Sequence, residues 1–327
     1  MTAIMPFGGV FSVLPTPFDP AGDVDRESLT RVIDLFLAAG VNGFTALGVT
    51  SEVARLTEAE RDLVLDTVLA HVNGRVPVVA GTTAEGLRTC IGYSARARRA
   101  GAAAVMISPP RMPKINSDAV ARHFADVSAA VDIPMIVQDY PPISGYAMEP
   151  ALLARIARDV PAARTIKLED PPTPFKTSRI LEHTKDLDVR IFGGLGGVFL
   201  LEELMAGAAG AMTGFAFPEI LVKIVTLFRA GRVDEAADVF YSTVALMRFE
   251  FQDGIGMAIR KEVLKRRGAI AHAGIRPPGV QLDQTTRDAL DRVLAWAGRE
   301  TPEAESLRSR PRDSEAARAG GGGAPRD

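Results

Sequence analysis

Eight short apolar runs, each followed by a segment with helical periodicity, are the feature that most constrains how this chain folds. The runs lie at residues 9–14, 41–48, 76–82, 103–109, 133–139, 163–169, 189–194 and 207–214. Helix signals separate them: Asp25 and Ser28, for example, stand near the start of one helical pattern and Gly40 follows its end. Strands that return through helices pair in parallel, and eight such units close without an exposed edge as a barrel. The sequence therefore predicts an α/β fold, a (β/α)8 TIM barrel with additional C-terminal helices.

An open, doubly wound sheet is the alternative architecture for the same alternation of elements. Such sheets bind dinucleotides through spaced glycines directly after a strand and an acidic residue further along. No strand of this sequence is followed by that pattern, so the barrel is the preferred prediction.

The chain continues beyond the eighth unit, which a helix at about residues 218–230 completes. Helical patterns at about 232–252, 255–267 and 283–298 follow. We expect a barrel over residues 1–230 and a helical extension over 231–298. Residues 299–327 are charged, rich in Gly and Pro and poor in large apolar side chains, and are predicted to form a disordered tail.

Composition excludes several classes of function. The net charge of −2 favours neither nucleic acid nor an anionic membrane surface, and no apolar run reaches the roughly 18 residues of a membrane span. With no basic, cleavable leader at the N-terminus, we expect a cytoplasmic protein. A lone Cys90 excludes an internal disulfide. The histidines are scattered without ligand spacing, so no metal site is expected; they are His71, His123, His183 and His272.

One lysine stands out on a predicted strand. The chain has seven lysines and 31 arginines, and Lys167 alone among the lysines lies in a barrel strand. Glu169 shares its face of the strand because side chains alternate, and both lie at the carboxyl end, where barrel active sites form. An amine among apolar side chains has a lowered pKa and can attack a carbonyl, which arginine cannot. The alternative is a strand-end ion pair without chemistry.

Taken together, several segments resemble the dihydrodipicolinate synthase / N-acetylneuraminate lyase family of Schiff-base-forming barrel enzymes. They are the N-terminal GVFSVLPTPF, GVTSE at residues 48–52, the strand lysine, and KEVLKRRGAIAHAGIRPPGVQLD near the C-terminus. The resemblance runs from about residue 8 to 294. It implies that Lys167 forms an imine with a 2-oxo acid, and that Gly48, Thr50 and Ser51 bind the substrate carboxylate. Ser51 as an ordinary helix N-cap is the structural alternative.

Four positions depart from the synthase pattern. Gln138 stands where the family has a proton-relaying tyrosine, and an amide does not titrate as a phenol does. Val49 replaces a relay threonine, Arg111 a second tyrosine, and Ile143 an arginine that holds a second carboxylate. Tyr140 can substitute for the missing phenol only if the chain bends, since two strand residues span about 6.6 Å.

These departures direct the functional prediction toward the dehydratase branch of the family. Glu169 is the candidate acid and base: it removes a C3 proton from the imine of Lys167 and then protonates the C4 hydroxyl as it leaves. We therefore expect a hydro-lyase acting on a 2-keto-3-deoxy sugar acid such as 2-keto-3-deoxy-L-arabonate, which would give 2-oxoglutarate semialdehyde. No cofactor is expected, because the lysine imine supplies the electron sink.

Two other functions stay open. In an aldolase the same enamine breaks or forms the C3–C4 bond and releases pyruvate. The second alternative is a barrel that binds a 2-oxo acid or a sugar phosphate without turnover. The glycine-rich residues 192–198 can offer backbone amides to a phosphate. For residues 192–198 we prefer a tight turn to a phosphate site. The resemblance implies that the backbone near Gly193 and Gly194 contacts the substrate. Met212 is a further candidate contact. The resemblance also implies a homotetramer, although Arg111 at a subunit contact leaves a dimer open.

Overall fold

A closed, all-parallel barrel forms the centre of the molecule in this computed structural model, which describes residues 7–297. Each strand pairs with the next along the chain, and β8 closes on β1. The strands are β1 (Gly9–Val13), β2 (Gly43–Ala46), β3 (Val78–Gly81), β4 (Ala104–Ile107), β5 (Met135–Asp139), β6 (Thr165–Leu168), β7 (Arg190–Gly193) and β8 (Gly210–Thr213). This closed ring of eight parallel strands confirms the predicted (β/α)8 barrel. Each strand also lies within one of the eight predicted apolar runs.

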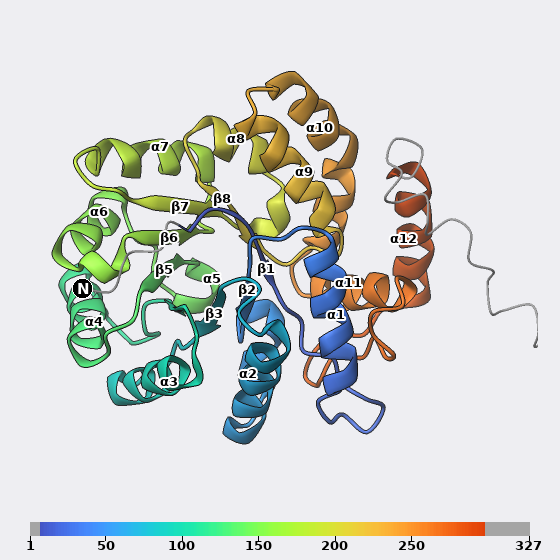
Figure 1. Cartoon of the computed structure of the whole chain (residues 1–327), viewed down its shortest axis with the longest axis horizontal. Coiled ribbons are helices and arrows are strands. Elements are labelled where there is room, and N and C mark those ends of the chain that lie inside the picture. The colour runs from blue at the N-terminus through green and yellow to red at the C-terminus, as the bar shows by residue number, and fades with distance from the viewer. Residues whose placement is uncertain (1–6, 298–327) are drawn as a thin grey trace, which may run out of the picture.

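Helices surround the barrel, as Figure 1 shows. The helices between strands are α1 (Arg26–Ala38), α2 (Glu58–Val72), α3 (Leu87–Ala100), α4 (Ser117–Ala130), α5 (Pro141–Ser144), α6 (Pro150–Asp159), α7 (Thr173–His183) and α8 (Leu200–Met205). Short 3₁₀ turns are η1 (Val49–Ser51), η2 (Val53–Arg55), η3 (Pro161–Ala163) and η4 (Leu195–Gly197). The predicted start signal of α1 is confirmed: a carboxylate oxygen of Asp25 accepts a hydrogen bond from the Ser28 amide at 2.9 Å.

Four helices follow β8: α9 (Pro218–Arg229), α10 (Val233–Glu250), α11 (Gly256–Arg266) and α12 (Gln284–Ala297). The last three gather on one side of the barrel in Figure 1, and α10 packs against α9, α11 and α12. They occupy the segment expected to form the helical extension. The division into barrel and extension stays a prediction, and the predicted tail at 299–327 lies outside the described residues.

The apolar core has two layers, as a barrel requires. The larger layer lies between the strands and the helices and includes Ile166 and Leu168 of β6. The smaller fills the barrel and consists of Phe7, Phe11, Val13, Val79, Ala104, Met106, Ile136, Phe192 and Met212. Membership of the two layers therefore tells which side chains face outward and which face inward.

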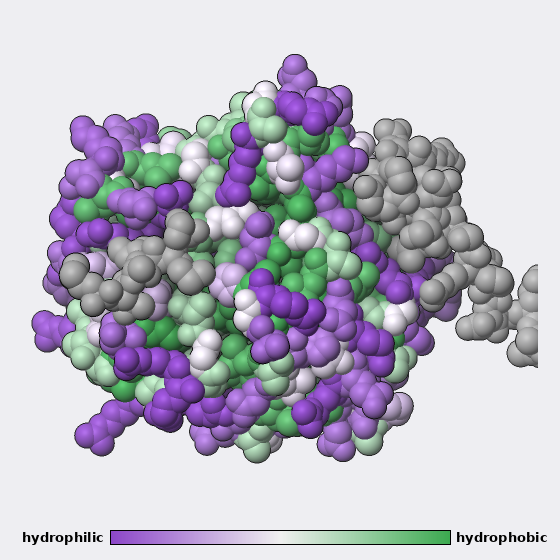
Figure 2. Space-filling view, viewed as in Figure 1, coloured by the Kyte–Doolittle hydropathy of each residue, from purple (hydrophilic) through white to green (hydrophobic). Residues whose placement is uncertain are grey.

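The outer surface mixes polar and apolar side chains over the face drawn in Figure 2. This mixture is typical of helices that bury one side and expose the other. Among the described helices, none combines the length and the apolar composition that a membrane span requires.

Candidate active site at the carboxyl end of the barrel

Lys167 and Glu169 project from the carboxyl end of β6 toward the barrel axis. Their neighbours Ile166 and Leu168 pack in the outer core layer, so alternation turns the lysine and the glutamate inward. In the sheet register Lys167 lies between Gln138 of β5 and Phe192 of β7. The predicted common face of Lys167 and Glu169 is thus what the strand geometry gives.

The two side chains form a buried ion pair. Nζ of Lys167 lies 3.0 Å from Oε2 of Glu169, and their side chains are only 6% and 9% exposed. Burial of both charges is costly unless each has further partners, so the contacts around the pair decide what it can do.

Gln138 supplies one of these partners. Its Nε2 donates a hydrogen bond to Oε2 of Glu169 at 2.7 Å, while its Oε1 accepts one from the Ser108 hydroxyl at 3.0 Å. Since Ser108 directly follows β4, a chain of contacts runs from β4 through β5 to the ion pair on β6. Because a carboxylate oxygen only accepts, Nε2 of Gln138 faces Glu169 and Oε1 faces the Ser108 hydroxyl, so the Gln138 side chain holds the carboxylate in place.

Gly194 leaves the space that Glu169 fills. A methyl group on Gly194 would lie 2.3 Å from Cγ of Glu169, which is too close for any real contact. Gly193 instead turns outward, toward the buried Glu203 of α8. The following turn has positive φ at Leu195, Gly196 and Gly197, as the predicted tight turn requires. Backbone contacts of Gly193 and Gly194 with a substrate stay a prediction.

Tyr140 lies where the chain leaves β5 and enters α5. Burial raises the pKa of its phenol, and the negative charges of Glu169 and Asp253 raise it further. The phenol therefore keeps its proton near neutral pH and can act as a hydrogen-bond donor near Glu169.

The GVTSE segment forms the turn η1, and the alternative interpretation of Ser51 as a helix N-cap does not hold. Ser51 is the last residue of η1, and Thr57 caps the next helix, α2. The buried Ser51 hydroxyl accepts a hydrogen bond from the Gly48 amide at 3.1 Å and donates one to the Leu14 carbonyl at 2.5 Å. These bonds fix the loop after β2 onto β1. Binding of a substrate carboxylate by Gly48, Thr50 and Ser51 stays a prediction.

The other residues singled out in the sequence occupy varied places. Met212 packs inside the barrel with Phe192 and the rest of the inner core layer. Arg111 is exposed, and Ile143 is 39% exposed on α5. Cys90 is buried in α3, where burial raises the pKa of its thiol to about 11, so the thiolate needed for reactivity is disfavoured.

Sequence reasoning missed a buried charged cluster behind the site. Lys176 of α7, interpreted only as a helical residue, contacts Asp139 at 2.5 Å and Asp170 at 2.7 Å. Burial raises the pKa of Asp139 to about 6, although Lys176 opposes that shift. The sequence signal for this cluster was an acidic residue directly after each strand-end site residue, Asp139 after Gln138 and Asp170 after Glu169. The cluster ties α7 to the ends of β5 and β6 and so supports both side chains.

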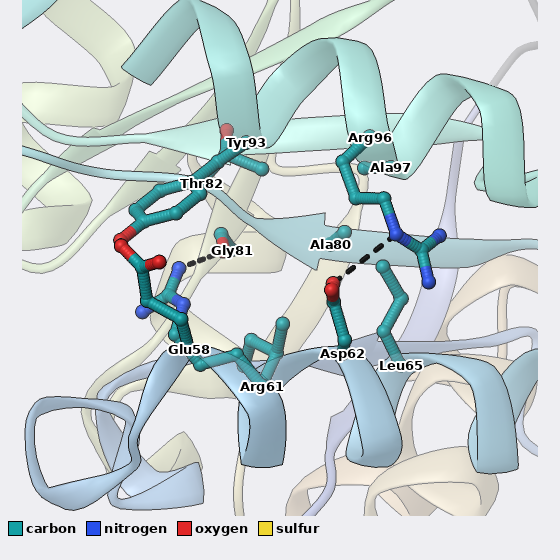
Figure 3. Close-up of a pocket in the computed structure, with 11 residues that line it drawn as sticks. Glu58, Arg61, Asp62, Leu65, Ala80, Gly81, Thr82, Tyr93, Arg96 and Ala97 are labelled. Atoms are coloured by element: carbon teal, nitrogen blue, oxygen red, sulfur yellow. Dashed lines mark hydrogen bonds and ion pairs between the residues drawn. The ribbon is translucent and has the colours of Figure 1, made fainter. Parts of the chain in front are cut away.

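A cavity of about 240 Å³ lies elsewhere, on the outer wall between α2 and α3 (Figure 3). Arg61 there donates to the Gly81 carbonyl, and Arg96 pairs with Asp62. Its lining residues do not include Lys167, Glu169, Gln138 or Ser108. Across residues 7–297, no group of three or more His, Cys, Asp or Glu side chains is placed to hold a metal.

Known proteins match this chain over the whole barrel. The model of the dihydrodipicolinate synthetase family matches residues 6–297. The chain is similar to an L-2-keto-3-deoxyarabonate dehydratase of Azospirillum brasilense, 35% identical over 303 residues, covering 88% of this chain and 96% of that protein. It is also similar to a 4-hydroxy-tetrahydrodipicolinate synthase of Methanoculleus marisnigri, 32% identical over 89% of this chain and 100% of that protein.

A solved structure agrees with these sequence comparisons. The crystal structure of a dihydrodipicolinate synthase from Rhodopseudomonas palustris superposes with a TM-score of 0.84 at 34% identity. The match covers 89% of this chain and 97% of that one.

Proposed function

The chain belongs to the dihydrodipicolinate synthetase family of lyases, and on that premise we propose that it dehydrates a 2-keto-3-deoxy sugar acid through an imine on Lys167. The observation that carries the proposal is the bond from Gln138 to Glu169. Where a synthase uses a phenol to move protons, this site has an amide that orients a carboxylate. Proton transfer at C3 and C4 then falls to Glu169. The similarity to an L-2-keto-3-deoxyarabonate dehydratase supports the same choice.

The first half of the reaction builds the electron sink. Nζ of Lys167 first passes a proton to Glu169 and, as a neutral amine, adds to C2 of the 2-oxo acid. Glu169 then returns that proton to the C2 oxygen, which leaves as water and gives an iminium. The positive nitrogen makes the C3 protons acidic. Glu169, 3.0 Å from Nζ before the reaction, removes one of them as general base and leaves an enamine.

The second half expels the C4 hydroxyl. Electrons of the enamine form the C3–C4 double bond as the C4–O bond breaks, and protonated Glu169 gives its proton to the departing oxygen as water leaves. With 2-keto-3-deoxy-L-arabonate, C5 and its hydroxyl then each lose a proton while C3 and C4 each gain one. Hydrolysis of the imine releases 2-oxoglutarate semialdehyde and restores the Lys167 amine.

The cytoplasmic location and the homo-oligomer belong to this proposal. We expect a homotetramer, with a dimer as the alternative because Arg111 stands where synthases place a tyrosine at a subunit contact. Light scattering of the purified chain separates the two states.

Product analysis tests the proposed reaction. The enzyme is incubated with 2-keto-3-deoxy-L-arabonate and followed by proton NMR, and 2-oxoglutarate semialdehyde is the expected product. Release of pyruvate would contradict the dehydratase proposal and support an aldolase. Condensation of pyruvate with aspartate semialdehyde is expected to be undetectable, and robust turnover there would contradict the role given to Gln138, Val49 and Ile143.

A further inference from the structure

Lys176 is a buried lysine that takes no part in the proposed reaction steps. It lies near the start of α7 and is 7% exposed, and its Nζ contacts Oδ2 of Asp139 at 2.5 Å and Oδ2 of Asp170 at 2.7 Å. Burial of an ammonium group is costly, and the positive end of the helix dipole opposes a cation at the start of a helix. Packing alone does not account for a lysine at this place.

The two carboxylates directly follow the residues that arrange the proposed proton transfer. Asp139 follows Gln138, and Asp170 follows Glu169. The Glu169 amide donates to the Asp139 carbonyl at 2.9 Å, and Nε2 of Gln138 donates to the Glu169 carboxylate at 2.7 Å. The end of β5 thus holds Glu169 by both its backbone and its side chain, and Lys176 holds the end of β5.

The far side of the cluster is anchored as well. Oδ1 of Asp139 accepts a hydrogen bond from the Met148 amide at 3.3 Å, just before α6 begins. At the start of α7 the Thr173 hydroxyl donates to Oε1 of the buried Glu203 on α8 at 2.6 Å. Lys176 therefore extends from a helix whose first turn is itself fixed, and its ammonium group has a defined position.

The loop that carries Glu169 has few backbone donors of its own. Three of the eight residues from 169 to 176 are prolines, which lack an amide hydrogen. Side chains must therefore fix the path of this loop, and the contact between Asp170 and Lys176 closes it.

We propose that Lys176 is a positioning residue for the reaction at Lys167: by joining Asp139 to Asp170 it fixes the strand end and the loop that hold Glu169. The inference rests on the proposed function, because it takes Glu169 to be the group that moves the C3 proton. Proton transfer needs a defined geometry, and a displacement of about 1 Å can cost roughly a hundredfold in rate. In this role Lys176 acts through its carboxylate partners and does not contact the substrate.

Proton exchange at C3 of pyruvate tests this role separately from dehydration. Pyruvate bound as the imine exchanges its methyl protons with deuterated solvent when Glu169 is correctly placed, and proton NMR measures the rate. For Lys176→Met we expect the exchange rate per trapped chain to fall roughly tenfold to a hundredfold, while saturating borohydride trapping on Lys167 continues. A merely structural role would lower exchange and trapping in the same proportion and leave their ratio unchanged.

Asp170→Asn is the second variant, because Lys176→Met leaves Asp139 buried without its charged partner, and this can prevent folding. The Asp170 side chain is 26% exposed, and the replacement keeps its size and leaves Lys176 paired with Asp139. The variant weakens the charged contact with the loop. We expect the exchange rate per trapped chain to fall by a smaller factor, roughly threefold to tenfold.

Lys185→Met is the matched control. Lys185 is exposed and follows the other end of α7, so its loss removes a lysine charge and leaves the contacts of Lys176 in place. Its ratio of exchange to trapping should equal that of the wild type. If folded Lys176→Met and Asp170→Asn proteins also keep the wild-type ratio, the inference is overturned.

The wild-type protein separates failure of this inference from failure of the proposed function. A wild type that forms no adduct with pyruvate, or that exchanges no C3 protons, would contradict the imine and the proton shuttle, and the inference with them. Normal trapping and exchange in the wild type, together with unchanged ratios in both variants, would overturn the inference alone.

Discussion

Nε2 of Gln138 donates a hydrogen bond to Oε2 of Glu169 at 2.7 Å, and the same oxygen lies 3.0 Å from Nζ of Lys167. One carboxylate oxygen thus receives both a neutral donor and a charged one. Because the Ser108 hydroxyl holds the other end of the amide at 3.0 Å, the Gln138 side chain has a single favourable orientation. Gln138 therefore positions the carboxylate that we propose as the proton-transfer group, and its amide does not transfer protons itself.

Replacing Gln138 by Leu tests this positioning role. The variant leaves Glu169 without its neutral donor, and we expect dehydration to fall roughly tenfold to a hundredfold while imine formation on Lys167 persists. Steady-state kinetics and borohydride trapping measure the two effects. Ser108→Ala should cause a smaller loss, because the amide keeps its bond to Glu169. Equal turnover of Gln138→Leu and the wild-type enzyme would rule out the role.

Glu169→Gln tests the proton shuttle. The amide keeps the size of the side chain but cannot transfer protons, so dehydration should fall by roughly 10² to 10⁴ while trapping at Lys167 continues. Exchange of C3 protons with deuterated solvent, followed by NMR, should fall in parallel. Tyr140→Phe is the comparison. A greater loss in Tyr140→Phe than in Glu169→Gln would transfer the role to the phenol.

Gly194→Ala tests whether the position of Glu169 matters. The added methyl would lie 2.3 Å from Cγ of Glu169 and must push the carboxylate away from Lys167. We expect dehydration to fall and the melting temperature to fall with it, because the methyl disturbs a buried ion pair. Gly254→Ala offers a control for a glycine substitution away from the site, where nothing lies within 4 Å of an added methyl. Because Gly254 has a positive φ, that control is expected to lose stability and keep its activity.

Glu203 should make stability depend on pH. Burial raises the pKa of this carboxyl to about 7, above its ordinary value of 4.5, and the hydroxyl of Thr173 only partly offsets that effect. The folded state then binds the proton more tightly than the unfolded state, so stability falls as pH rises from about 4.5 through 7. Across that range Glu203→Gln should gain up to about 3 kcal/mol in unfolding free energy relative to wild type.

Urea unfolding at pH 5 and pH 8 checks this gain. Glu182→Gln, at an exposed carboxylate paired with Arg179, should show no comparable gain. A constant difference between Glu203→Gln and wild type at both values would show that Glu203 is ionised in the folded protein throughout.

Much of the fold was predictable because barrels repeat a local pattern. Each strand lies inside a predicted apolar run, and the alternation along β6 was enough to place Lys167 and Glu169 on one face. Contacts between distant segments were not predictable. Gln138 was interpreted as a lost tyrosine, since nothing local indicates that Ser108 orients it.

The alternative interpretation of Ser51 as a helix N-cap does not hold. A serine ahead of a helical segment is typical of an N-cap, but η1 and η2 intervene before α2 begins, and Thr57 caps that helix. Tertiary contacts decide the difference, because the Ser51 hydroxyl bonds to the Leu14 carbonyl on the neighbouring chain segment.

The mass of the intact protein after borohydride reduction with pyruvate tests the central claim most directly. An imine on Lys167 predicts one covalently added, reduced ligand per chain, and peptide mapping should place it on Lys167. Lys167→Ala should remain folded and gain no mass. Labelling of another lysine, such as the buried Lys176 or Lys261, or the absence of any adduct on a folded wild-type protein, would contradict the account.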